Sequence, residues 1–265
     1  GEVLVCHTCG YRRQVPKKCP TCGSTAIRQY GTGTEKVETE VRQQFPGARV
    51  LRFDSETTRQ KGAHEILLAH FASQRADILV GTQMLAKGLD LPLVTLVGVI
   101  LADVGLSLPD YRAAERTFQL LMQVAGRAGR SPLGGKVVLQ TFKPEVYPIQ
   151  AAATHDYEGF YQRELANRRQ IGYPPFSRLV RVESRGDDPE AVERASRSAA
   201  VQLRAWIAEG QFDATELIGP VPCYYSRVDG LYRWQVILRG PDPTTMLNGL
   251  PLMGWTVEVD PPNLL

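Results

Sequence analysis

The segment Leu120–Arg130 constrains this chain more than any other, because it places two Gly-Arg pairs three residues apart after a glutamine. These residues are Gln123, Gly126-Arg127 and Gly129-Arg130. On a helix, residues three apart share a face, so both arginines would point the same way, beside small residues that leave room for a phosphate chain. Two guanidiniums suit a triphosphate, and an arginine that neutralises charge in phosphoryl transfer contributes about 10³–10⁵ in rate. A solvated basic helix end is the alternative.

A second informative stretch runs from Asp77 to Asp90. It opens with an apolar run that predicts a buried strand, and Gly81-Thr82 then predicts a turn. Another apolar run, Leu93–Leu101, has the character of a parallel strand. It ends at Asp103, which could imitate a metal carboxylate, although capping of a loop is its more ordinary role.

In chain order, the stretches Asp77–Asp90 and Leu120–Arg130 resemble motifs V and VI of superfamily 2 helicases, respectively. The resemblance implies that four residues near the turn touch the nucleic-acid backbone: Gly81, Thr82, Gln83 and Lys87. It also implies that Asp90 reaches the ribose of ATP, with Gly88 beside it. Arg127, Arg130 and Gln123 would act on the triphosphate, which Gly126 and Gly129 allow to approach.

Beyond these two motifs, the amino-acid sequence resembles the primosomal protein N′ (PriA) family over essentially all 265 residues. The matching segments are residues 31–41, 81–103 and 109–130, the cysteine pairs upstream, and the IGYPPFSRL and EVDPPNLL segments downstream. The resemblance covers only the C-terminal portion of that family's length. It implies a replication-restart DNA helicase of bacteria, which uses ATP and Mg²⁺.

Bulk properties agree with an ordinary globular chain. Hydrophobic content of 43% and charged content of 22% are typical of soluble domains, and the length allows one to three of them. A net charge of +3 permits contact with nucleic acid but is too small to argue for it. No apolar run approaches the ~18 residues of a membrane span, no signal peptide occurs, and the first residue is glycine. We therefore expect a piece of a longer cytoplasmic protein, associated with the nucleoid.

Four of the five cysteines form two C-x-x-C-G knuckles. They are Cys6, Cys9, Cys19 and Cys22. Zinc prefers four thiolates in a tetrahedron, and each knuckle supplies two, which favours a zinc ribbon over disulfide or redox chemistry. In the PriA family this module has eight cysteines that hold two ions in interleaved pairs, and these four match its last half. The resemblance thus implies one or two ions in the intact module, and one or none in this chain. Cys223 is expected to be a buried core thiol.

The sequence divides into four expected parts: a zinc ribbon at 1–28, a RecA-like second helicase lobe at 29–148, a connecting helix at 149–172 and a small α+β domain at 173–265. In the lobe, strands alternating with helices predict a parallel sheet covered on both faces. The chain contains no Walker A or Walker B motif, so alone it should bind ATP feebly and hydrolyse none.

The lobe opens with Gly31, Thr32, Gly33 and Thr34. Residues 35–44 read as a helix with Thr34 as its N-cap, which is a sufficient structural role for the segment. The free N–H groups of the same helix end could hold a DNA phosphate, as the helicase resemblance suggests.

The C-terminal domain reads as strand, helix, strand, strand, helix, strand, the split βαβ order, with a hairpin turn at Asp229-Gly230. Arginines at 227, 233 and 239 alternate with aromatic residues. That mixture could stack bases or hold phosphates, and it could equally be one solvated face of a sheet. In the family this domain helps engage branched DNA and the acidic tail of single-strand-binding protein, which makes Arg233 and Gln235 candidates.

Three functions compete at this point. The first is a monomeric, ATP-driven 3′-to-5′ DNA helicase that acts on forked and single-stranded DNA and helps reload the replicative helicase. Its partners would include single-strand-binding protein, other primosome proteins and the helicase-loading system. No association with a membrane is expected. The second is a non-enzymatic fork-binding scaffold with a degenerate motor. The third, a zinc-ribbon adaptor for RNA or ribosomal partners, has no need of two Gly-Arg phosphate contacts.

Overall fold

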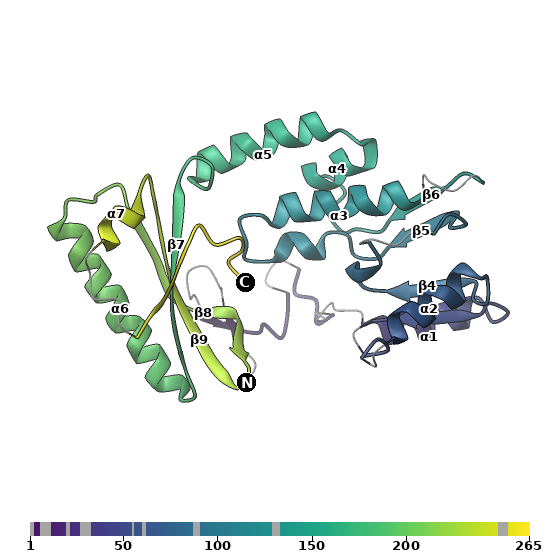
Figure 1. Ribbon diagram of the computed structural model, residues 1–265, viewed down its shortest axis with the longest axis horizontal. Helices are drawn as coiled ribbons and strands as arrows, with labels where there is room; N and C mark the ends of the chain where they lie inside the picture. Colours follow the sequence, from purple (N-terminus) through teal and green to yellow (C-terminus); the bar gives the residue numbers. More distant parts are fainter. Residues whose placement is uncertain are drawn as a thin grey trace. The chain divides into compact units, whose positions relative to one another are not determined.

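The computed structural model describes most of the 265 residues (Figure 1). The described residues are 3–5, 12–19, 22–26, 33–54, 56–59, 62–86, 91–128, 133–248 and 254–265. The chain forms two compact units. The central unit consists of Lys18–Asp103 and Thr117–His155, and the C-terminal unit consists of Gly1–Lys17, Val104–Arg116 and Asp156–Leu265.

The central unit is built from parallel strands and helices. Its elements are α1 (Thr34–Gln44), β3 (Val50–Phe53), α2 (Ala63–Ala72), β4 (Ile78–Gly81), the 3₁₀ turn η1 (Gln83–Ala86), β5 (Leu96–Val99), most of α3 (Ala113–Ala128), β6 (Lys136–Leu139) and α4 (Tyr147–Thr154). β3 pairs in parallel with β4, and β5 pairs in parallel with β6. Both α1 and α2 contact β3, and Phe53 of that strand is fully buried. The predicted parallel α/β architecture is confirmed, because alternating strands and helices bring parallel strands together through helical crossovers.

The C-terminal unit contains a four-stranded antiparallel sheet in the order β10-β7-β9-β8. Its elements are β1 (Val3–Val5), β2 (Arg12–Gln14), η2 (Val104–Ser107), α5 (Tyr157–Ile171), β7 (Arg178–Gly186), α6 (Pro189–Glu209), β8 (Glu216–Val228), β9 (Leu231–Gly240), α7 (Pro243–Leu247) and β10 (Thr256–Val259). β9 lies between β7 and β8 and is antiparallel to both, so β7 and β8 run the same way. The predicted split βαβ order is therefore confirmed.

Local signals explain the ends of these elements. Asp188 accepts a hydrogen bond from the Glu190 N–H, and Pro189 opens α6 where its missing N–H costs nothing. Asp229 and Gly230 have φ of 51° and 83°, the left-handed values that a tight hairpin turn between β8 and β9 requires.

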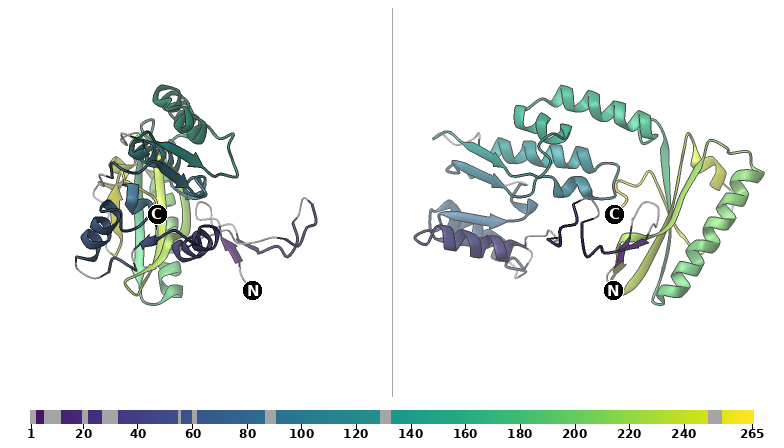
Figure 2. Two further views of the ribbon diagram at one scale, coloured as in Figure 1. Left: turned by 90° about the vertical axis from the view of Figure 1, so that its right-hand side faces the viewer. Right: turned by 180° about the vertical axis from the view of Figure 1, so that it is seen from behind.

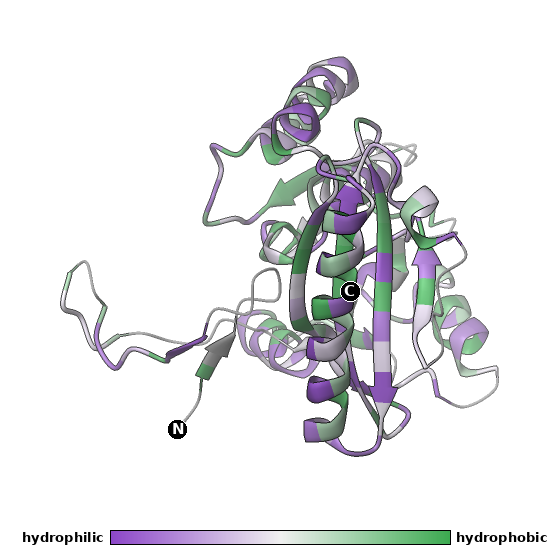
Figure 3. Ribbon diagram, turned by 90° about the vertical axis from the view of Figure 1, so that its left-hand side faces the viewer, coloured by the Kyte–Doolittle hydropathy of each residue, from purple (hydrophilic) through white to green (hydrophobic). Residues whose placement is uncertain are grey.

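The main core of the C-terminal unit lies between α6 and the sheet. Val180 and Val182 of β7 and Val236 and Leu238 of β9 alternate with outward-facing residues and pack against Leu203 of α6. Figure 3 shows this alternation as bands of hydropathy along the strands, and Figures 2 and 3 show α6 along one face of the sheet. The opposite face has a smaller apolar cluster of Leu179, Ile237 and Leu264.

The connection expected as one helix at 149–172 is two helices, which corrects the sequence interpretation. α4 ends at Thr154, its C-cap residue His155 has a left-handed φ of 56°, and α5 starts immediately after Asp156. The Asp156 carboxylate accepts a hydrogen bond of 2.8 Å from the Gly159 N–H, so it caps a new helix instead of continuing the old one. Within the described residues, none of the helices has the length and apolar character that a bilayer crossing requires.

Candidate functional site

The predicted motif V turn follows directly from the end of β4. Gly81 is the last residue of that strand and lies opposite Phe53 of β3. A Cβ atom at Gly81 would lie 2.4 Å from the Phe53 carbonyl oxygen, so only glycine fits this register. Thr82 and Gln83 follow at the carboxyl end of the strand pair, exposed, where parallel sheets usually bind ligands. Lys87, Gly88 and Asp90 lie outside the described residues.

The start of α1 differs from the expected cap. The N-cap residue is Gly33, and Thr34 is the first helical residue, so the interpretation of Thr34 as the N-cap is wrong. Its hydroxyl instead donates a 2.5 Å hydrogen bond to the carboxylate of Asp54, immediately after β3. Gly31 and Thr32 are not among the described residues.

Asp54 is a buried anion that ties the loop after β3 to the first turn of α1. Besides the Thr34 hydroxyl, its carboxylate accepts the N–H groups of Glu56 and Thr57 at 3.0 and 2.9 Å and lies 3.1 Å from Arg52. The hydrogen bonds from Thr34 and Thr57, helped by Arg52, lower the pKa of Asp54 to about 2 against the effect of burial. Sequence reasoning missed Asp54, because its partner Thr34 lies twenty residues away.

The first part of motif VI is helical, as predicted. α3 runs to Ala128, and Gln123 and Gly126 are exposed on it. Among the described residues, no atom outside α3 and the chain neighbours of Gly126 lies within 4 Å of the position that a Cβ of Gly126 would occupy, so these residues leave space for a ligand to approach the backbone. The side chain of Arg127, and Gly129 and Arg130 entirely, lie outside the described part of the chain. Their common orientation stays a prediction.

Asp103 has the structural role expected of it. Its carboxylate accepts hydrogen bonds from the Thr141 hydroxyl at 2.7 Å and the Phe142 N–H at 3.0 Å. Burial raises the pKa of Asp103, but these two hydrogen bonds outweigh it and the pKa is lowered. The carboxylate thus joins the segments that follow β5 and β6. The ring of His64 packs against that of Phe53, with 4.8 Å between the two ring centroids.

Of the four predicted zinc ligands, Cys19 and Cys22 lie in the described residues, and Cys6 and Cys9 do not. The Gly23 N–H donates to the Cys19 carbonyl oxygen at 2.9 Å, and Gly23 has a left-handed φ of 71°. This is the tight turn that a C-x-x-C-G knuckle needs. No cluster of three or more ligand side chains occurs among the described residues, which contain only half of the predicted set. Cys223 is buried, as predicted, and burial raises its pKa to about 12.

The two candidate partner residues, Arg233 and Gln235, face the side of the C-terminal sheet away from α6. Arg233 makes a bidentate pair with the buried carboxylate of Glu183, at 2.7 and 2.9 Å. Gln235 is 3% exposed and donates a 3.4 Å hydrogen bond to the Leu264 carbonyl oxygen. Within the described residues, its own side-chain oxygen is buried without a partner.

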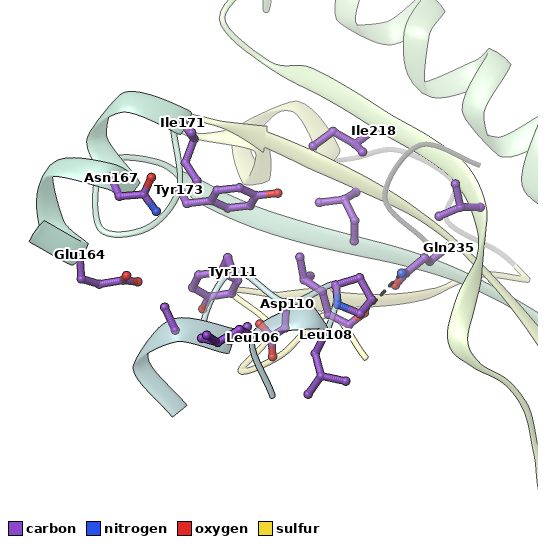
Figure 4. Close-up of a pocket in the computed structure, with 16 residues that line it drawn as sticks. Leu106, Leu108, Asp110, Tyr111, Glu164, Asn167, Ile171, Tyr173, Ile218 and Gln235 are labelled. Carbon is purple, nitrogen blue, oxygen red and sulfur yellow. Dashed lines mark hydrogen bonds between the residues drawn. The ribbon is translucent and has the colours of Figure 1, made fainter. Parts of the chain in front are cut away.

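Gln235 lines a pocket of about 310 Å³ within the C-terminal unit (Figure 4). Most of its lining is apolar or aromatic, including Leu106, Leu108, Tyr111, Ile171, Tyr173, Ile218, Ile237 and Leu264. Asp110, Glu164, Asn167 and Gln235 add polar groups. Sequence reasoning missed this pocket, since no periodicity indicates that residues 104–116 pack with the C-terminal sheet.

Comparison with known proteins gives two domain matches. Residues 26–132 match the helicase conserved C-terminal domain, and residues 169–262 match the primosomal protein N C-terminal domain. The relatives include proteins named replication restart protein PriA. The one from Bacillus subtilis is 46% identical over 246 residues, which cover 93% of this chain and 30% of that protein. Those from Synechocystis and Haemophilus influenzae are 44% and 37% identical, over 90% and 94% of this chain and 28% and 34% of their own lengths. The chain therefore spans about a third of these relatives.

Proposed function

This chain belongs to the PriA family as its C-terminal portion, and from that premise we propose that it is the second motor lobe and C-terminal domain of an ATP-dependent DNA helicase. The complete protein would move 3′-to-5′ on DNA, recognise forked replication intermediates and help reload the replicative helicase. One observation carries the proposal: α3 presents Gln123 and Gly126 on an open helix face directly before Arg127.

Residue roles follow from the placement of the two motifs. Arg127 and Arg130, with Gln123, would neutralise charge on the triphosphate as the terminal phosphoryl group departs. Gly126 and Gly129 would leave room for the phosphates, and Asp90, beside Gly88, would bind the ribose. The DNA backbone would contact Gly31, Thr32, Gly33, Thr34, Gly81, Thr82, Gln83 and Lys87. ATP with Mg²⁺ supplies the phosphoryl group, and in the complete protein a Walker A lobe would hold it.

The proposed partners are forked and single-stranded DNA, single-strand-binding protein, other primosome proteins and the helicase-loading system. The proposed location is the cytoplasm, in association with the nucleoid. Between the two candidate partner residues, Gln235 is better placed than Arg233. The Arg233 guanidinium is already paired with Glu183, whereas the Gln235 side-chain oxygen faces a pocket.

DNA-stimulated ATP hydrolysis by the full-length protein tests the proposal. We expect forked DNA to stimulate turnover more strongly than linear DNA when both are compared at one stated salt concentration, because phosphate contacts depend steeply on salt. Tight fork binding without turnover would point to a non-enzymatic scaffold instead.

We further propose that the N-terminal segment binds zinc through Cys6, Cys9, Cys19 and Cys22. The turn at Cys19–Gly23 fits one half of a tetrathiolate site. Bound zinc would fix the fold of residues 1–28, which are too few to bury an independent core.

Replacement of Cys19 by serine should reduce the zinc content from about one equivalent per chain to none, because three thiolates hold the ion far more weakly than four. Metal analysis of the purified chain measures this, with Cys223→Ala as the control that keeps its zinc. Absence of zinc from both the unaltered chain and the full-length protein would rule out the ribbon.

A further inference from the structure

The helix that carries motif VI begins in one compact unit and ends in the other. Its first turn, Ala113 to Arg116, belongs to the C-terminal unit with the preceding loop, whereas Thr117 onwards belongs to the central unit. Glu115 and Arg127 are twelve residues apart on this one helix, a rise of roughly 18 Å.

The first turn of α3 is held to α5 by a chain of ion pairs. Arg168 of α5, whose side chain is 13% exposed, donates to Glu164 at 2.6 Å and to Glu115 at 2.7 Å. Glu115 also accepts from Arg112 at 2.9 Å. Burial raises the pKa of Glu115, but the hydrogen bonds from Arg112 and Arg168 outweigh it and lower that pKa, so the carboxylate stays charged near neutral pH.

The same turn is also held by the end of the chain. Tyr111 stacks on Tyr173, with ring centroids 5.6 Å apart, and its hydroxyl donates to the Pro261 carbonyl oxygen at 3.4 Å. Arg116 donates to the Pro262 carbonyl oxygen at 2.6 Å and pairs with the fully buried carboxylate of Asp110. Figure 4 shows Tyr111 facing Tyr173 across the pocket.

We propose that Arg168 and Glu115 are positioning residues through which the C-terminal domain controls the motif VI arginines. α3 is one continuous helix, so ion pairs that hold its first turn stabilise the helix that also carries Gln123, Gly126 and Arg127. Ligand binding that breaks these contacts of α5 or residues 261–264 would lower the stability of α3. The functional part of this inference rests on the proposed helicase function, whereas its structural part does not.

Hydrogen exchange in the 265-residue chain tests the structural part. Arg168→Gln should accelerate amide exchange several-fold in residues 120–128 and leave α1 and β3 unchanged. Glu115→Gln should do the same, and the effect of the double variant should be smaller than the product of the two single effects, because both variants remove the shared Arg168–Glu115 pair. Arg163→Gln, at an exposed position on the same helix, is the matched control. Unchanged exchange at 120–128 in both single variants would overturn the proposal.

Turnover of the full-length protein tests the functional part. Arg168→Gln should lower fork-stimulated kcat about 5- to 150-fold, the range of typical coupling between sites, with KM for ATP and fork affinity nearly unchanged. Arg168→Lys should be intermediate, since an ammonium lacks the planar fork that reaches both carboxylates. Faster exchange with unaltered kcat would overturn the control of motif VI. If the unaltered protein shows no turnover, the helicase proposal fails, and the exchange result still decides whether the C-terminal domain holds α3.

Discussion

Replacement of Arg130 by alanine in the full-length protein should lower fork-stimulated ATP hydrolysis by about 10³–10⁵-fold. The guanidinium would stabilise negative charge that develops only as the phosphoryl group is transferred, so the loss should appear in kcat. Affinity for forked DNA should change little, because the DNA contacts are proposed at other residues. Steady-state turnover and fork binding, measured on the same preparation, separate the two effects.

Companion variants sharpen this test. Arg127→Ala should reduce turnover comparably, and the double variant should lose much less than the product of the single losses, since both residues act on one transition state. Arg130→Lys should recover only part of the rate, because an ammonium keeps the charge but not the planar donor pair. Arg75→Ala, at an exposed position in the central unit, should leave turnover intact. Near-normal turnover in Arg130→Ala would remove the assignment of this arginine to catalysis.

Replacement of Glu183 by glutamine should lower the free energy of unfolding of the C-terminal unit by about 3–5 kcal/mol. Glu183 is 2% exposed in the centre of the sheet, where it holds Arg233 in two hydrogen bonds and also pairs with Arg185. The neutral amide would leave the Arg233 guanidinium, whose side chain is 12% exposed, without its charged partner in a region shielded from water. Urea unfolding followed by tryptophan fluorescence measures this unit, because Trp206, Trp234 and Trp255 all lie in it.

The matched control is Glu193→Gln on α6, the same chemical change in an exposed pair with Arg197. That pair should contribute only about 0.3–0.5 kcal/mol. If the two variants lose equal stability, the Glu183 cluster is not a buried ion-pair network in solution.

The Glu183 effect should also depend on pH. Burial raises its pKa, but the hydrogen bonds from Arg233 and Arg185 outweigh burial and lower it. A carboxylate with a lower pKa in the folded state stabilises fully above its unfolded pKa of about 4.3, and this contribution is lost as the pH falls through the folded value. The difference between the unaltered chain and Glu183→Gln should thus be constant from neutral pH to about pH 5 and shrink below about pH 4.

Local features of the fold could be predicted because each depends on residues close together in the chain. The helix expected after the first strand of the C-terminal domain is α6, Pro189–Glu209, and an Asp-Pro start with an apolar stripe suffices to define it. The hairpin at Asp229-Gly230 and the strand Thr256–Val259 follow from turn chemistry and alternation in the same way. The prediction of a single helix at 149–172 is wrong because two local preferences compete there. One is continued apolar periodicity, and the other is a new helix cap at Asp156.

Prediction of the candidate site was limited for a different reason. The spacing of Gln123, Gly126 and Arg127 indicates a phosphate-binding helix face without any knowledge of the fold, and the structure places these residues on α3. The partners of Thr34 and Arg233 could not be predicted, because Asp54 and Glu183 lie 20 and 50 residues away along the chain. Only strand order and register decide that β9 lies beside β7.

The amino-acid sequence by itself therefore determined the family and the order of helices and strands in the C-terminal domain, and it predicts the chemistry of motifs V and VI, because these depend on residue type and short spacing. Tertiary structure decided which charges are paired and which polar atoms are buried. It also decided that residues 110–116 pack with Arg168 and Pro262, which leaves the motif VI helix with its two ends in different units. Such contacts form only when distant segments bury a common apolar surface, so no local pattern encodes them.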